Sequence, residues 1–361
     1  MGSIKSICFI GAGLAGGGIE RGFTTLANYF SGQGFQVTVL LLFKSDHFFQ
    51  PDYKIRIIEP GYRRKKYYKY YYAGRTILYL RKKLREINPD VIVSFGEWIN
   101  PFVIFSTRGL NYPVFVFDRM SPHLRLGFVI DNAKKLFYKK ASGIIAQTPF
   151  AAEVIRRKTG AKNISVIPNP LHALNYPPLA KKNQICTLGR LSKEKGHKYL
   201  IEAFSGLKHK EWTLHIIGDG PERSSLENLT RSLFISDRVI FYGHLPDFTE
   251  ILSQSQIFVL PSLSEGFPNA LIEAMSVPLA CISSDCVSGP ADIINPGENG
   301  MLVPPGDING LSEAMNDLIE NPLKREHLAK QAFRIRERLD IQKISADILS
   351  FISGEAKGNY N

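Results

Sequence analysis

The sequence lacks any apolar run long enough to cross a bilayer as a helix, which argues against a membrane-spanning segment. Residues 1–9 also lack the apolar core of a signal peptide, so we expect the chain on the cytoplasmic side of the membrane. Cysteine is scarce, and its spacing is typical of neither a metal finger nor a disulfide framework. We expect core thiols at Cys8, Cys186, Cys281 and Cys286.

Acidic residues are outnumbered, because 33 Asp and Glu stand against 45 Lys and Arg and give a formal net charge of +12. This excess predicts an anionic partner. A nucleotide-sugar, an anionic lipid surface or a nucleic acid would each satisfy it on charge alone. The chain of 361 residues is long enough for two domains with separate cores, and its composition is that of a globular protein.

Short apolar strands alternate with helical stretches, which is typical of α/β proteins whose parallel sheets carry helices on both faces. The expected strands of the first half are residues 5–10, 37–43, 90–95, 113–117, 143–146 and 164–167. Those of the second half are residues 185–188, 213–217, 239–242, 257–261, 279–282 and 301–303. The expected last helices are residues 308–320, 322–338 and 341–352. Residues 167–179 contain prolines without periodicity and are interpreted as an interdomain linker.

The first strand leads into a glycine-rich loop, residues 11–18, and then into a helix. Glycine lets the backbone close on an anion at a helix N-terminus, and Gly11, Gly13 and Gly16 match the dinucleotide fingerprint. An oxidoreductase is therefore one alternative. That alternative requires an acidic residue at the end of the second strand, where Lys44 stands instead. Close packing of the loop on the helix is a further explanation of the glycines.

Residues 260–275, LPSLSEGFPNALIEAM, are interpreted as a strand end, a tight loop and the first turns of a helix. Glu265 lies in the loop and Glu273 on the helix. Pro268 is expected at the first helical position, where its missing N–H has no cost. The surrounding amides would then point outward as a cradle for an anion. These amides belong to Gly266, Phe267 and Asn269.

The strand at residues 185–188 leads into residues 189–196, GRLSKEKG, which contain several cations. A guanidinium such as that of Arg190 can bind phosphate oxygens through a bidentate fork, and an ammonium such as that of Lys195 adds a point charge. We expect both to bind a diphosphate. Lys193 is interpreted as a solvent-facing charge.

The spacing of Glu265 and Glu273, after a serine-rich strand end, resembles the signature of the retaining glycosyltransferases of family 4. Further segments of the second half match in the expected order, namely residues 188–196, 218–221, 288–294 and 299–307. The resemblance implies the GT-B fold, in which two Rossmann-like, doubly wound domains face each other across a cleft. It also implies transfer of a sugar from a nucleotide-sugar to an acceptor.

The resemblance implies roles for individual residues. Arg190 and Lys195 would stabilise the departing diphosphate, Glu265 would hold the transferred sugar, and Glu273 would accept from the ribose hydroxyls. Further substrate contacts are implied at Gly17, Gly18, Gly218, His244 and Leu245. His244 could equally stabilise its own loop. The sequence contains no Asp-x-Asp, the metal-holding motif of the other large glycosyltransferase fold, so we expect neither a metal nor another cofactor.

Residues just past the carboxyl ends of parallel strands face the ligand crevice, and residues 96–98, 118–119 and 147–148 qualify in the first half. Asp118 stands where many family relatives place a histidine near the reacting sugar. An acidic residue followed by arginine resembles relatives that act on lipid-linked saccharides, so we assign Asp118 to the catalytic set. His123 as a substitute, and an Asp118–Arg119 ion pair that only fixes the loop, remain alternatives.

Residues 62–85 hold the densest mixture of basic and aromatic residues, which suits contact with an anionic membrane surface. A solvated loop followed by an ordinary amphipathic helix is the alternative. Aromatic residues among cations can also stack on bases, but no nucleic-acid module accompanies them, so we expect no nucleic acid.

Together these features predict a GT-B glycosyltransferase with domains at residues 1–169 and 170–340, and a helix crossing back within residues 341–361. We expect it to transfer a hexose or N-acetylhexosamine from a UDP-sugar to a saccharide acceptor, lipid-linked and destined for a bacterial surface glycan. Such an enzyme would lie peripherally on the inner face of the membrane. A nucleotide-sugar epimerase of the same fold remains an alternative.

Overall fold

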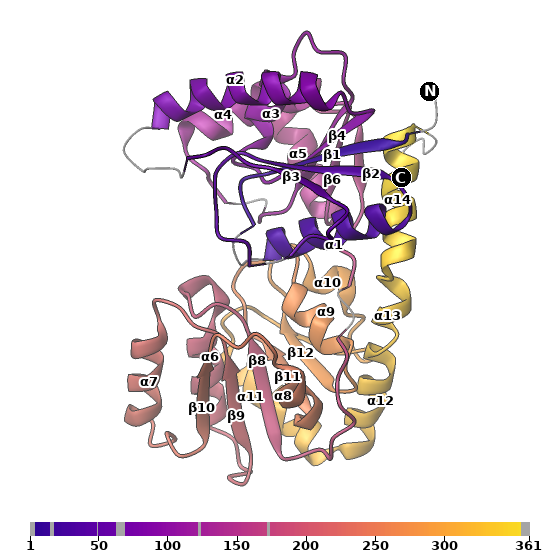
Figure 1. Cartoon of the computed structure of the whole chain (residues 1–361). Coiled ribbons are helices and arrows are strands. Elements are labelled where there is room, and N and C mark those ends of the chain that lie inside the picture. The colour runs from indigo at the N-terminus through magenta and orange to yellow at the C-terminus, as the bar shows by residue number, and fades with distance from the viewer. Residues whose placement is uncertain are drawn as a thin grey trace. The chain divides into compact units, whose positions relative to one another are not determined.

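A computed structural model of the protein describes residues 4–14, 18–48, 50–62, 69–121, 124–171 and 174–354. Contacts divide the chain into two compact units, both of α/β construction (Figure 1). Unit 1 comprises Met1–Pro170 and Asp340–Asn361, and unit 2 comprises Leu171–Leu339. The end of the chain therefore belongs to the same unit as its beginning.

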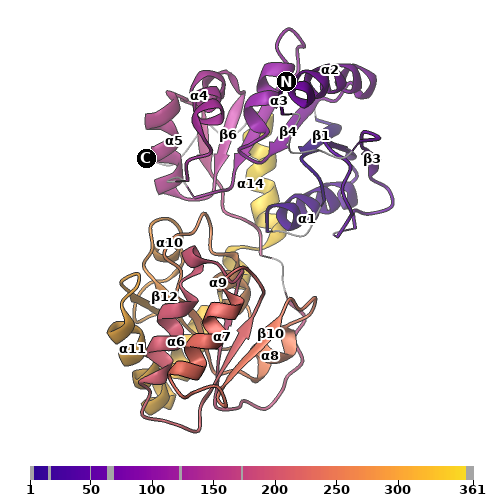
Figure 2. The ribbon, with the colours of Figure 1, turned by 90° about the vertical axis from the view of Figure 1, so that its left-hand side faces the viewer.

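Unit 1 is built on a seven-stranded sheet in the order β3-β2-β1-β4-β5-β6-β7, and all its pairings are parallel. Its strands are β1 Ser6–Gly11, β2 Gln36–Leu41, β3 Arg56–Ile58, β4 Val91–Phe95, β5 Val114–Asp118, β6 Gly143–Ala146 and β7 Ile164–Val166. Its helices are α1 Gly18–Gly32, α2 Lys69–Ile87, α3 Asn100–Ser106, α4 Phe128–Phe137, α5 Pro149–Thr159 and α14 Ile341–Ser353, with a 3₁₀ turn η1 at Tyr138–Lys140. Helices α1 and α14 pack side by side, and α2, α3, α4 and α5 follow one another as neighbours (Figure 2).

Unit 2 is built on a six-stranded parallel sheet in the order β10-β9-β8-β11-β12-β13. Its strands are β8 Gln184–Leu188, β9 Thr213–Ile217, β10 Val239–Gly243, β11 Ile257–Leu260, β12 Ala280–Ser284 and β13 Met301–Val303. Its longer helices are α6 His197–Ser205, α7 Arg223–Ser232, α11 Ile308–Glu320 and α12 Pro322–Ala332. The shorter ones are α8 Thr249–Gln254, α9 Asn269–Met275, α10 Pro290–Ile293 and α13 Ile335–Arg338, with a 3₁₀ turn η2 at Lys193–Lys195.

The central strands of both sheets are buried and mostly apolar, as expected for parallel strands covered on both faces. In unit 1 the rings of Phe9, Phe23, Phe95 and Phe117 pack on one another, with Phe95 and Phe117 stacked at 4.2 Å between centroids. All four cysteines are buried, which confirms the expectation of core thiols. Among the described residues, no helix combines the length and the apolar character needed to cross a membrane.

Most expected strands lie within two residues of their observed positions, but two expectations were incomplete. The short edge strand β3, Arg56–Ile58, was missed. Residues 322–338 were expected as one helix and instead form α12 and α13. The break lies beside Arg336, whose guanidinium donates to the carbonyls of Ser276 and Leu174. These contacts join residues that are distant in sequence, so a continuous helix pattern does not predict them.

Candidate functional site

Two glycines allow the loops at the carboxyl ends of the unit 2 strands to pack backbone against backbone. A Cβ on Gly196, whose φ is +66°, would lie 2.0 Å from the carbonyl oxygen of Pro261. A Cβ on Gly218, at φ +137°, would lie 1.9 Å from the carbonyl oxygen of Gly189. Only glycine fits either position. The loop after β8 is therefore fixed against those after β9 and β11.

This packing brings together Lys195 and Glu265, which are 70 positions apart in the chain. The Lys195 ammonium lies 2.8 Å from Oε1 and 2.9 Å from Oε2 of Glu265. The Ser262 hydroxyl donates to the same carboxylate at 2.7 Å. Glu265 is 6% exposed, whereas the side chain of Lys195 is 24% exposed. A buried carboxylate thus holds an ammonium that still reaches the surface of the unit.

The electrostatic potential around the loop after β8 is positive. Burial acts to raise the pKa of Glu194, but the hydrogen bond from Ser192 and the charges of Lys195 and Arg190 outweigh it, and the pKa falls below its usual value. Burial lowers the pKa of the neighbouring His197 to about 4, with a further contribution from Lys195. His197 is therefore neutral near pH 7, and the positive potential comes from Lys195 and the exposed Arg190.

The loop before α9 corrects one expectation. Helix α9 begins at Asn269, and Pro268 is its N-cap at ψ 71° rather than its first helical residue. The amide of Asn269 donates to the carbonyl of Phe267 at 2.9 Å, so it does not point outward as part of an anion cradle. The expectation for the Asn269 amide was wrong for this reason, whereas Asn269 as a substrate contact stays a prediction. For the amides of Gly266 and Phe267 the cradle stays a prediction.

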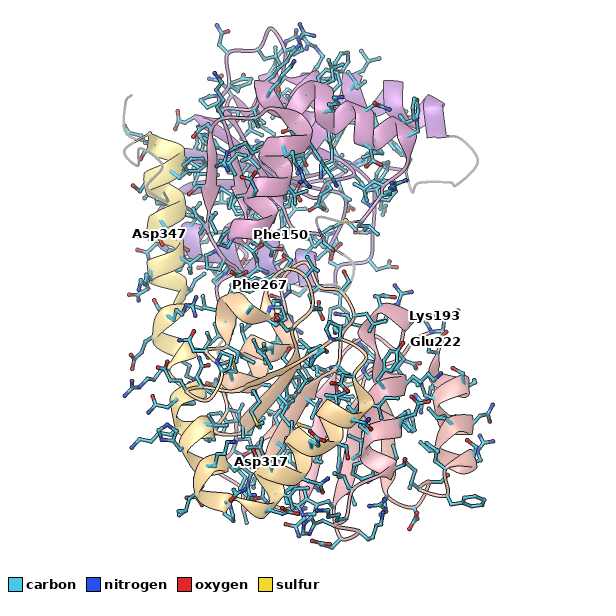
Figure 3. All side chains as sticks on the ribbon, turned by 180° about the vertical axis from the view of Figure 1, so that it is seen from behind. Phe150, Lys193, Glu222, Phe267, Asp317 and Asp347 are labelled. Atoms are coloured by element: carbon cyan, nitrogen blue, oxygen red, sulfur yellow. The ribbon has the colours of Figure 1, made fainter. Side chains whose placement is uncertain are left out.

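The remaining candidate residues of unit 2 lie on the neighbouring loops and on α9. Gly218 follows β9 and donates its amide to Gly243 at 2.8 Å, directly before His244 and Leu245. Glu273 is 6% exposed on α9. Figure 3 labels Lys193, Glu222 and Phe267, which belong to the loops after β8, β9 and β11; Asp317, on α11, lies at the opposite end of the unit.

In unit 1, Asp118 ends β5 and is 4% exposed. Its Oδ2 accepts from the Lys134 ammonium at 2.8 Å and from the Tyr138 hydroxyl at 3.1 Å. Burial acts to lower the pKa of Lys134, but the charges of Asp118 and Glu97 raise it overall, so Lys134 stays protonated. The carboxylate of Asp118 is thus held by α4 and the turn that follows it.

Arg119 takes a different role from the ion pair considered as an alternative. Its guanidinium lies 4.5 Å from the Phe117 ring centroid and donates to Asn169. The salt bridge of Asp118 goes to Lys134 instead. Among the remaining candidates, Gly18 is the first residue of α1, and Gly16, Gly17 and His123 lie outside the described residues.

Comparison with known proteins identifies the family. Residues 16–173 match the family model described as glycosyltransferase family 4, and residues 175–335 match that of glycosyl transferases group 1. A lipopolysaccharide 1,6-galactosyltransferase of Escherichia coli is 32% identical over 262 residues, covering 69% of this chain and 70% of that protein. The chain is a family 4 glycosyltransferase. It has the GT-B fold of that family.

Two further proteins are similar to this glycosyltransferase over nearly its whole length. A Campylobacter jejuni α-1,4-N-acetyl-D-galactosaminyltransferase, named for an undecaprenyl-diphosphate-linked acceptor, is 24% identical and covers 97% of this chain and 99% of its own. The crystal structure of Anabaena HepE with UDP and glucose superposes with a TM-score of 0.80 at 19% identity, covering 97% of this chain and 99% of its own. Membership of the family removes the oxidoreductase alternative for the glycine loop.

The glycosyltransferase contains one buried acid that the sequence analysis placed beside the ligand crevice without assigning it a role. Glu97 follows β4 and is 1% exposed. Its Oε1 accepts from the amides of Arg119 and Met120, the latter at 2.6 Å. Its Oε2 is buried and has no hydrogen-bond partner among the residues that the structure describes. Burial, together with the charge of Asp118, raises the pKa of Glu97 to about 8.

Glu97 and Asp118 line a pocket of about 210 Å³ in unit 1, formed by the loop after β5 and by helices α4 and α5. The position of Glu97 directly after a strand was the only feature of the sequence that pointed to it as a site residue. A single acidic residue there is too common to select, because its burial depends on the loop after β5, more than twenty residues later.

Proposed function

We propose that the protein transfers a hexose or N-acetylhexosamine from a UDP-sugar to a lipid-linked saccharide acceptor, with retention of anomeric configuration and without a metal. The observation that carries this proposal is the Lys195–Glu265 pair, with its buried carboxylate, at the carboxyl edge of the unit 2 sheet in a family 4 chain. The names of relatives support the choice of substrates. One transfers galactose to lipopolysaccharide, another acts on an undecaprenyl-linked saccharide, and HepE binds UDP and glucose.

The donor diphosphate is assigned to the electropositive loop after β8. Its charge grows as the bond to the anomeric carbon breaks, so fixed cations stabilise the transition state more than the ground state. Lys195 supplies one such cation, already oriented by Glu265, and Arg190 supplies a planar fork of donors. The Glu265 carboxylate would accept from hydroxyls of the transferred sugar. Glu273 would accept from the ribose.

Retention follows if the acceptor attacks the same face of the sugar from which the diphosphate leaves. The bond between the anomeric carbon and the UDP oxygen breaks, and a bond from that carbon to the acceptor oxygen forms. A phosphate oxygen of the departing UDP takes the acceptor's proton, so no side chain acts as nucleophile. Asp118 is proposed to orient the acceptor, since Lys134 and Tyr138 fix its carboxylate.

The proposal places the protein peripherally on an anionic membrane surface through residues 62–85. Residues 63–68, and the side chains of residues 69–73, lie outside the described part. In the described part of α2, Leu78 is 71% exposed, and Lys82 and Arg85 are exposed beside it. An apolar side chain among cations suits such a surface. Co-sedimentation with phosphatidylglycerol vesicles tests this assignment, and binding that persists in Leu78→Ser and Lys82→Glu variants would overturn it.

A screen of donors tests the reaction itself. The purified protein is incubated with UDP-glucose, UDP-galactose and their N-acetylhexosamine counterparts, each with a rough lipopolysaccharide or an undecaprenyl-linked saccharide. We expect UDP release that depends on the acceptor and persists in EDTA, and a product whose new linkage has the donor's anomeric configuration by NMR. Inversion, loss of activity in EDTA, or an isomerised UDP-sugar formed without acceptor would each contradict the proposal.

A further inference from the structure

The pocket of unit 1 is lined by buried acids, one of which pairs with the largely buried Lys134, and by exposed cations. Its inner wall includes the carboxylates of Glu97 and Asp118, which are 1% and 4% exposed. Its outer wall includes Arg125, Lys135 and Lys158, all of which are exposed. A ligand that enters would meet cations first and carboxylates last.

The inner wall offers groups that recognise hydroxyls. Glu97 lines the pocket, and its Oε2 is a buried oxygen without a partner among the described residues. A buried polar atom without a partner has a free-energy cost that a ligand hydroxyl would remove. Asp118 beside it keeps acceptor capacity, because Lys134 and Tyr138 both donate to its Oδ2. Two adjacent carboxyl groups suit neighbouring hydroxyls of a sugar ring.

The outer wall offers groups that recognise an anion. Lys135 lies on α4, Lys158 on α5 and Arg125 in the loop before α4, so three elements converge with one sign of charge. Asp131 is the only acidic residue beside them among the described lining residues. Convergent cations at a pocket mouth attract a phosphate more strongly than scattered surface lysines do.

We propose that this pocket binds a saccharide that carries a phosphate, with the sugar hydroxyls on Glu97 and Asp118 and the phosphate on Lys135 and Lys158. The inference rests on the proposed function, since it names the class of acceptor that the transferase uses. The phosphate could belong to a phosphorylated sugar or to the lipid carrier of an acceptor. The shared chemistry is a polyol joined to a phosphate.

The first test compares glucose 6-phosphate, glucose and inorganic phosphate as probes in titration calorimetry of the full chain. We expect glucose 6-phosphate to bind at least about tenfold more tightly than either of the others, because only it uses both walls. The double variant Lys135→Ala, Lys158→Ala should lose this preference. A matched double variant, Lys139→Ala, Lys140→Ala, removes the same charge from exposed residues that do not line the pocket and should keep it.

Three outcomes would overturn the inference. If glucose 6-phosphate bound no better than glucose, the pocket would have no anion site. If it bound no better than inorganic phosphate, the pocket would have no sugar site. Equal losses of affinity for glucose 6-phosphate in the two double variants would show that the net charge of the protein, and not this pocket, causes the preference. UDP affinity, measured in the same samples, should be unchanged in all variants. If the donor screen failed, the calorimetry would therefore still test this pocket. If the pocket did not bind glucose 6-phosphate, the donor screen would still test the proposed function.

A second test distinguishes a role of Glu97 in binding from a structural one. Glu97 faces Asp118 from β5, Lys134 from α4, Tyr138 from the turn after α4 and the Arg119 guanidinium from the loop after β5. It accepts from the Arg119 and Met120 amides. With a pKa of about 8 it is protonated near pH 7 and donates from Oε2, and it becomes a second anion above pH 8. Affinity for glucose 6-phosphate should therefore fall several-fold between pH 7 and pH 9.

The variant Glu97→Gln keeps a neutral donor at this site and both backbone hydrogen bonds, so its affinity should match that of the wild type near pH 7 and stay level to pH 9. A fall of the same size in Glu97→Gln would show that another group titrates and would overturn the role of Glu97. If the acceptor instead provides its phosphate through the lipid carrier, a water-soluble isoprenyl-diphosphate disaccharide should compete with glucose 6-phosphate.

Discussion

Replacing Lys195 by alanine is expected to lower kcat by about 10²- to 10³-fold, the effect of removing one preorganised donor from a developing negative charge. The ammonium is oriented by two contacts of 2.8 and 2.9 Å to Glu265, so little of its binding energy is lost to ordering at the moment of reaction. Kinetics at saturating acceptor, with UDP release as readout, measure the effect. UDP affinity should also weaken.

The same substitution leaves Glu265 buried with Ser262 as its hydrogen-bond donor. Loss of the charged partner is expected to lower the free energy of unfolding by about 1–3 kcal/mol, so most of the protein stays folded at 25 °C. Circular dichroism checks this point. Lys193→Ala is the matched control, because Lys193 is exposed in the same loop and should keep wild-type turnover. A folded Lys195→Ala protein with unchanged kcat and UDP affinity would remove Lys195 from the site.

The parallel sheets were predictable because strands covered on both faces are apolar at nearly every position. The strand β3 escaped prediction since it has three residues, begins with Arg56 and pairs only with β2 at the edge of the sheet. A short edge strand buries little, so its sequence carries little of the pattern.

Most residues of the candidate site of unit 2 could be predicted from the sequence, as most strands could. Its residues stand in short segments directly after strands, and the topology of parallel sheets gathers those segments at one edge. The pairing of Lys195 with Glu265 was not predicted, because it depends on the approach of Gly196 to Pro261. The geometry at Pro268 was missed for a related reason. Proline favours the first turn of a helix statistically, whereas ψ 71° at Pro268 is fixed by the packing of its loop.

Chemistry that depends on burial was the least predictable. Glu97 owes its raised pKa to burial and to Asp118, which stands 21 positions later. Sequence spacing gives no measure of burial at a loop. Asp118 could be selected from its place after β5, but its partner Lys134 could not, because a lysine on a helix is usually solvent-exposed.

The second large effect is expected from Gly196→Ala, which should destabilise unit 2 by about 3 kcal/mol or more. Two penalties combine. The left-handed backbone at φ +66° costs a non-glycine residue about 1 kcal/mol, and the new Cβ would lie 2.0 Å from the Pro261 carbonyl oxygen, where only backbone can give way. Gly297→Ala, at φ +81° with nothing within 4 Å of its Cβ, is the matched control and should pay the first penalty alone.

Urea unfolding followed by tryptophan fluorescence measures this difference within unit 2. Trp212 is 3% exposed in the core of unit 2, and Trp98, the other tryptophan, belongs to unit 1. All variants are therefore made in a Trp98→Phe background, so that the signal reports unit 2. Gly196→Ala should also weaken UDP binding, because a displaced loop moves Lys195 from Glu265. Equal stabilities of Gly196→Ala and Gly297→Ala would show that the loop yields without cost, and the close approach to Pro261 would then not be what positions Lys195.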